Sequence, residues 1–99
     1  MVESSNSPWD RLRWARLAAN ISARELDRLA GLAEGHTALL EAGKKNDIEM
    51  RTAKKLKSAL GVTLDWLVIG EGDPPTTEHI LSSVKAAQAA AAASAAGAA

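Results

Sequence analysis

Five helix-ending residues divide positions 9–70 into short segments, and their spacing constrains the fold more than any other feature of the sequence. They are Asn20, Gly31, Gly43, Gly61 and Gly70. Glycine and, less readily, asparagine accept the left-handed backbone conformation that closes a helix. Between them, apolar residues recur at spacings of three and four, and no segment alternates apolar and polar residues as a β-strand does. The pattern predicts an all-α chain.

The expected helices lie at 9–20, 23–31, 37–43, 48–60 and 64–69. The second begins with a capping box, because Ser22 and Glu25 stand three residues apart. Pro74 and Pro75 then end helical structure until a further stretch opens at Thr76. Eleven of the last 14 residues are alanine, which favours a helix but buries little surface. We expect a flexible lead at 1–8, a compact five-helix domain at 9–72, and a proline linker with an alanine-rich helical tail at 73–99.

Length, cysteine content and charge limit the classes of function. The 99 residues are enough for one ordinary domain, and the lack of cysteine excludes disulfides and thiolate metal sites. Twelve basic and twelve acidic side chains cancel, yet residues 1–60 carry a net charge of +3 and residues 61–99 a net charge of −3. The basic half is therefore the half expected to meet an anion. No segment has the pattern of a membrane span or a signal peptide, and we expect a cytoplasmic protein.

Residues for catalysis are few. His36 and His79 are the only imidazoles, and no nucleophile motif or metal-ligating pair accompanies them. Gly70 and Gly72 lack the third glycine and the preceding strand of a dinucleotide-binding loop. We therefore expect no enzyme, no metal and no cofactor.

Residues 22–43 carry the most specific pattern in the chain. The pairs Glu25-Leu26 and Ala30-Gly31 are followed by the run Leu40 to Gly43 and then by two lysines, and a second matching run extends from Ser58 to Leu67. In this order and spacing the chain resembles the helix-turn-helix domains of the phage Cro and repressor family over roughly residues 11–72. The resemblance implies a compact five-helix, lambda-repressor-like domain whose second and third helices bind duplex DNA, with two copies spanning two half-sites.

The resemblance also assigns candidate residues. Ala23 and Arg24 at the start of the second helix, and Lys44, Lys45 and Asn46 after the third, would contact phosphate. Arg16 and Glu41 occupy positions at which the family often has a buried ion pair between the first and third helices. The short helix with Leu64, Trp66 and Leu67 would form the dimer interface, and the later stripe of Ile80 and Val84 is the other candidate for it.

The expected base-reading positions are unusual. They are Ala33, Glu34, Gly35, His36, Ala38, Leu39 and Ala42. None carries a guanidinium or amide group, which could make two hydrogen bonds to one guanine or adenine. Glu34 could accept a hydrogen bond from cytosine, and His36 could donate one to a purine. Two interpretations therefore stay open. One is a dimeric DNA-binding regulator, with Arg51, Lys54 and Lys55 adding positive charge, and the other is a helix-turn-helix domain that binds a protein partner through Ala38, Leu39 and Ala42.

Overall fold

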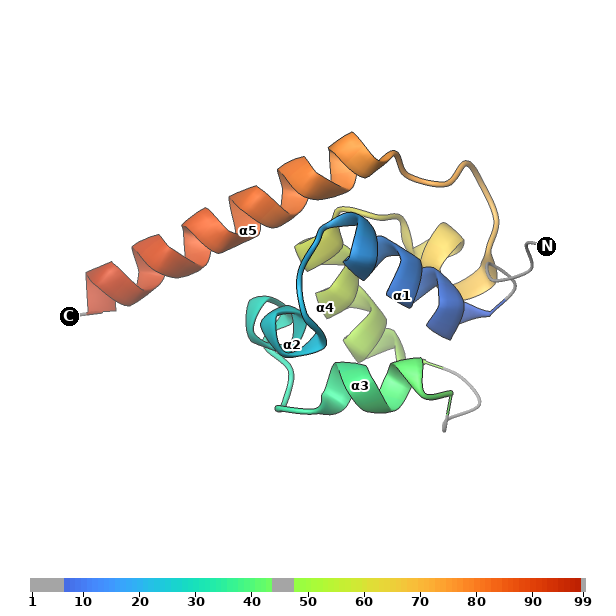
Figure 1. The fold of residues 1–99 in the computed structure, drawn as a ribbon, viewed down its shortest axis with the longest axis horizontal. Coiled ribbons are helices and arrows are strands. Elements are labelled where there is room, and N and C mark those ends of the chain that lie inside the picture. The colour runs from blue at the N-terminus through green and yellow to red at the C-terminus, as the bar shows by residue number, and fades with distance from the viewer. Residues whose placement is uncertain (1–6, 44–47, 99) are drawn as a thin grey trace.

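A computed structural model describes residues 7–43 and 48–98, and all regular structure in these ranges is helical. The elements are α1 (Pro8–Ala18), α2 (Ala23–Ala30), α3 (His36–Glu41), α4 (Met50–Leu60), the π-helix η2 (Asp65–Ile69) and α5 (Thr77–Ala98). Figure 1 shows α1 to η2 gathered into one body, with α5 lying across it. The expected all-α fold is confirmed. Most of the expected lead, residues 1–6, lies outside the described residues.

Local signals set the helix ends. The Ser7 and Ser22 hydroxyls accept hydrogen bonds from the amides three residues later, at 3.1 Å and 3.0 Å, and so begin α1 and α2. Asn20 is left-handed, with φ of 58°, and follows the end of α1. Left-handed glycines follow α2, α4 and η2, at the helix ends that the sequence predicts.

The core is mostly aliphatic, with Trp9 and Trp66 added, and draws on every element. Its fully buried large side chains are Leu12, Leu26, Leu40, Leu56, Leu60, Leu67 and Ile80. Leu26 of α2, Leu40 of α3 and Ile80 of α5 belong to the same cluster. Packing therefore extends beyond residue 72, where we expected the compact domain to end.

The first part of α5 docks on α1, α2 and α4. Ile80 and Val84 are 0% and 2% exposed, and His79 Nε2 lies 2.8 Å from the Gly61 carbonyl oxygen at the end of α4. The Gln88 amide donates to the Glu25 carboxylate of α2 at 3.4 Å. Our alternative expectation that Ile80 and Val84 contact a second copy is wrong, because the chain's own core covers both side chains.

Gly61 allows α5 to approach α4. Its φ is +73°, and a Cβ placed there would overlap the Ser83 side chain of α5. Any other residue would therefore be strained in its backbone and would push α5 away.

A buried arginine closes η2. Arg11 of α1 is 3% exposed and donates from Nε to the Leu67 carbonyl and from Nη2 to the Val68 carbonyl, both at 3.1 Å. These bonds satisfy carbonyls at the end of the helix that its own turns leave open. Burial lowers the pKa of the Arg11 guanidinium from its ordinary value, yet the group stays charged at any physiological pH.

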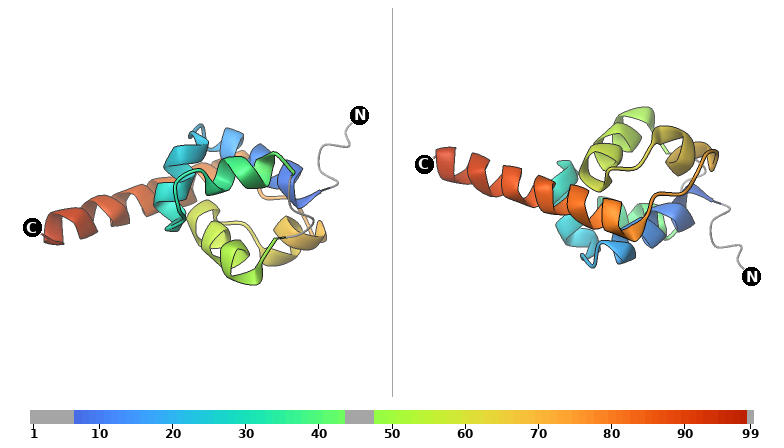
Figure 2. Two further views of the ribbon diagram at one scale, coloured as in Figure 1. Left: turned by 90° about the horizontal axis from the view of Figure 1, so that it is seen from below. Right: turned by 90° about the horizontal axis from the view of Figure 1, so that it is seen from above.

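The two faces of the molecule differ. Figure 2 shows α3 in front when the molecule is seen from below and α5 in front when it is seen from above. The second half of α5 extends past α2, away from the rest of the chain (Figure 1). Because α5 lies on the opposite side, none of the described helices covers the outer side of α3. Among the described residues, no helix is long and apolar enough to cross a membrane.

Candidate nucleic-acid interface

The short helix α3 is held by its inner side and free on its outer side. Thr37 and Leu40 are 0% and 2% exposed and face the core. Ala38, Leu39 and Ala42 are exposed, and the Leu39 side chain keeps 54% of its accessible surface. Leu26 and Ala30 anchor the preceding α2 in the same core. The pair therefore presents one outward face made of α3, the turn at residues 31–35 and the start of α2.

Asp27 caps α3 from the neighbouring helix. Its side chain is buried on α2, and its two carboxylate oxygens accept from the Gly35 and Thr37 amides, each at 2.8 Å. The N-cap position of α3 itself is Gly35, which has no side chain to do this. Reasoning from the sequence missed this role. The sequence gives no local signal for it, because the carboxylate meets amides eight and ten residues away.

Arg16 and Glu41 join α1 to α3 in a bidentate ion pair. The Nε–Oε2 and Nη2–Oε1 distances are 2.6 Å and 2.9 Å, and the two side chains are 14% and 11% exposed. Arg16 also donates to the Ile21 carbonyl at 2.8 Å, between α1 and α2. The hydrogen bond to Glu41 raises the pKa of Arg16 above its ordinary value. This pair is the second tie on α3, at the end opposite Asp27.

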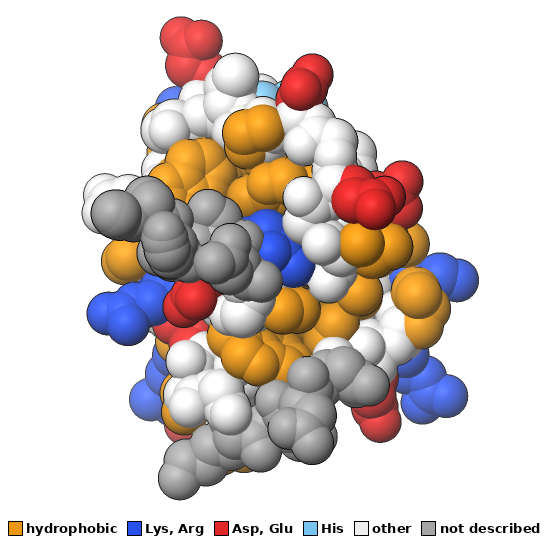
Figure 3. Space-filling view, turned by 90° about the vertical axis from the view of Figure 1, so that its right-hand side faces the viewer, with side chains coloured by type: hydrophobic (Ala, Val, Ile, Leu, Met, Phe, Trp, Pro, Cys, Tyr) orange, Lys and Arg blue, Asp and Glu red, His pale blue; other side chains and the backbone are white. Residues whose placement is uncertain are grey.

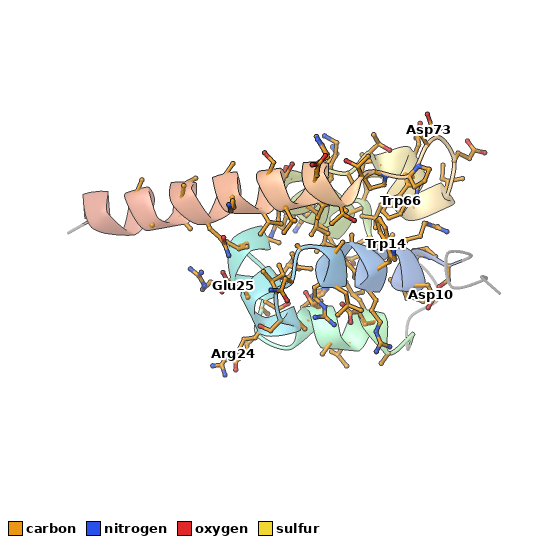
Figure 4. The ribbon with its side chains drawn as sticks, turned by 45° about the horizontal axis from the view of Figure 1, so that its top comes forward. Asp10, Trp14, Arg24, Glu25, Trp66 and Asp73 are labelled. Carbon is orange, nitrogen blue, oxygen red and sulfur yellow. The ribbon has the colours of Figure 1, made fainter. Side chains whose placement is uncertain are left out.

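The charged side chains at the start of α2 lie in ion pairs. Arg24 contacts Glu34 of the turn at 3.0 Å, and both side chains are more than two-thirds exposed. Arg28 pairs with Glu25 at 2.7 Å, and its hydrogen bond lowers the pKa of the Glu25 carboxyl. Figure 4 shows Arg24 and Glu25 projecting from α2, away from Trp14 and Trp66. A shallow groove on this side is lined by Ser22, Arg24, Glu25, Asp27, Arg28, Leu32 and Glu34.

The expected DNA-contacting residues fall into three groups. Arg24, Ala33, Glu34, Ala38 and Leu39 are exposed, whereas Ala23, Gly35 and His36 are half-buried. The expected phosphate contacts at Lys44, Lys45 and Asn46 lie outside the described residues. The pairing with Arg24 offsets the charge that Glu34 would present to phosphate.

One cation of α4 lies on the same side of the molecule as the outer face of α3. The Lys55 ammonium donates to the Gly31 carbonyl at 3.5 Å and so stands beside the turn between α2 and α3. Arg51 and Lys54 of the same helix are exposed. In the ranges the structure describes, no cluster of side chains could hold a metal ion.

The expected dimer residues of η2 are mostly covered. Trp66 and Leu67 are 5% and 0% exposed, and the Trp66 ring packs edge to face on Trp14 at 5.8 Å between centroids (Figure 4). Both side chains belong to the core, where we also expected Trp66 to pack, and they leave almost no surface for the contact with a second copy that we expected of them. Leu64 and Val68 are half-buried and Ile69 is 60% exposed. Figure 3 shows hydrophobic side chains gathered on this end of the molecule, with basic atoms among them and both acidic and basic side chains at the edge.

These features define the class of protein. Two short helices joined by a turn, the second lying on the outside and tied to the core at both ends, are a helix-turn-helix unit within a small all-α domain. The chain belongs to the lambda repressor and Cro-like helix-turn-helix family, whose model matches residues 12–67. Comparison with curated proteins and with solved structures found no match. Membership makes the chain a DNA-binding helix-turn-helix regulator, in a family that is not normally enzymatic.

Proposed function

We propose that the chain binds duplex DNA as a dimer, with α3 in the major groove and the start of α2 on the phosphate backbone, in the manner of Cro and the repressors. The observation that carries this proposal is the uncovered outer face of α3, fixed by Asp27 at one end and by the Arg16–Glu41 pair at the other. A helix held in this way can enter a groove without rearranging the core.

The charges suggest that backbone contacts supply most of the affinity. Several cations are suited to contact phosphate: Arg24, Lys55, and Lys44 and Lys45, for which the sequence predicts this role. The outer residues of α3, by contrast, offer no bidentate contact to guanine or adenine. Binding should therefore depend strongly on salt and only modestly on sequence.

A dimer is supported by the apolar surface that η2 leaves uncovered. Ile69 is exposed beside the half-buried Leu64 and Val68. We propose that this surface, rather than Trp66 or α5, contacts a second copy.

Binding to duplexes at two salt concentrations tests the proposed function. We expect labelled duplexes of random sequence to bind at low salt and to be released as salt rises, because cations on the protein displace counterions. Duplexes selected from a random pool should bind more tightly than the pool. No binding to either at low salt would contradict the proposal.

The second candidate function is binding of a protein partner by the face made of Ala38, Leu39 and Ala42. The observation in its favour is that this exposed face is apolar. The variant Glu34→Gln separates the two functions, because it removes a carboxylate near phosphate and adds an amide that can pair with adenine. If the chain binds DNA, Glu34→Gln should bind duplex DNA more tightly than the wild type and prefer a different sequence. If it binds a protein partner instead, neither change is expected.

A further inference from the structure

The beginning of α3 depends on a residue outside α3. Gly35, the N-cap residue, has φ of +89° and no side chain, so it cannot accept from the first amides of the helix. The His36 amide bonds to the Ala33 carbonyl at 3.0 Å within the turn. The Gly35 and Thr37 amides are satisfied by the Asp27 carboxylate alone among the hydrogen bonds described for them.

Asp27 is built into the junction of the two helices. Asp27 is only 3% exposed, so its carboxylate contacts protein groups rather than solvent. Its backbone carbonyl also accepts from the Leu32 amide at 2.8 Å, at the turn that follows α2. One residue thus connects α2, the turn and the first turn of α3.

We propose that Asp27 is the positioning residue of the DNA-reading helix: its buried carboxylate fixes the direction in which α3 leaves the turn and so sets where Ala38 and Leu39 meet DNA. This inference rests on the proposed function. The carboxylate occupies the Gly35 and Thr37 amides, so these amides are not available to a phosphate. Asp27 therefore acts on DNA through α3 and not by contact.

The variant Asp27→Asn distinguishes positioning from simple electrostatics. Its amide oxygen can accept one of the two bonds, but its NH2 group would face the other amide donor. Removing a negative charge near DNA would by itself strengthen binding. Positioning predicts the opposite sign, a loss of affinity for a selected duplex of about tenfold or more, with an unchanged slope of log affinity against log salt.

Two control variants are matched to this test. Asp65→Asn removes the same charge from an exposed position on η2 and should not weaken binding. Val84→Ala removes buried volume from α5, on the side of the molecule opposite α3, and lowers stability without touching the turn (Figure 2). At a temperature where both are folded, Val84→Ala should bind as the wild type does.

Hydrogen exchange gives a readout that does not need DNA. In Asp27→Asn the Gly35 and Thr37 amides should exchange faster, relative to the amides of α4, than in the wild type. The proposal is overturned if Asp27→Asn binds as well as the wild type, if Val84→Ala weakens binding equally, or if the exchange at Gly35 and Thr37 does not change. A wild-type chain that binds no duplex would overturn the proposed function, and the exchange result would still decide whether Asp27 holds α3.

Discussion

Among the ion pairs of the described residues, the Arg16–Glu41 pair is the least exposed to solvent. Glu41→Ala leaves the Arg16 guanidinium mostly buried without its carboxylate, which costs about 3 kcal/mol of unfolding free energy when a pair is largely desolvated. The control Glu34→Ala breaks the exposed pair with Arg24, which is worth at most about 1 kcal/mol. Urea unfolding of the two variants measures the difference. Small and equal losses would show that the pair does not tie α1 to α3.

Individual residues differ in how far the sequence reveals their roles. The family resemblance pointed to Arg16 and Glu41, because the family often has a buried ion pair at these two positions. Asp27 and Arg11 could not be predicted in this way. The Asp27 carboxylate meets amides eight and ten residues away, and Arg11 meets carbonyls 56 and 57 residues away, only after the helices have packed.

At the scale of the elements, helix ends were more predictable than helix contacts. Glycines after α2, α4 and η2 end these helices where we expected, because their left-handed conformation is a local property. The expected fourth helix began two residues early, and the expected last helix of the domain is a π-helix. The docking of α5 was missed because the apolar residues between positions 80 and 84 do not themselves show which surface will cover them.

The docking of α5 can be tested through Gly61. Gly61→Ala should destabilise the chain more than Gly31→Ala. Both glycines follow helices at nearly the same φ, +73° and +72°. Backbone strain should therefore lower the unfolding free energy of both variants by the same amount, about 1 kcal/mol. Only at Gly61 would the new Cβ overlap Ser83 of α5, whereas nothing lies within 4 Å of a Cβ at Gly31. Thermal unfolding compares the two, and equal losses would mean that α5 does not depend on this close approach.

At the scale of the whole molecule, self-association should depend on the exposed end of η2. Ile69→Glu puts a charge into the proposed contact between two copies and should weaken the dimer by about tenfold or more. Leu39→Glu is the matched control, because Leu39 is similarly exposed but lies on α3. Sedimentation equilibrium measures both. A dimer unchanged by Ile69→Glu would place the contact elsewhere.

The division of the molecule into an uncovered α3 face and an opposite α5 face underlies the proposed function (Figure 2). It also supplies two substitutions that change the net charge equally. Leu39→Glu lies on the outer side of α3, and Leu81→Glu lies at an exposed position on α5. Any general effect of added negative charge on DNA binding should be similar in the two.

Fluorescence anisotropy of a labelled duplex at low salt, with these two variants and the wild type, tests the central claim most directly. We expect Leu39→Glu to weaken binding by about tenfold or more, because it places a carboxylate in the groove among phosphates. Leu81→Glu should bind within about twofold of the wild type, because its charge lies on the far side of the molecule. Equal affinities of Leu39→Glu and the wild type would contradict the claim that α3 enters the DNA groove.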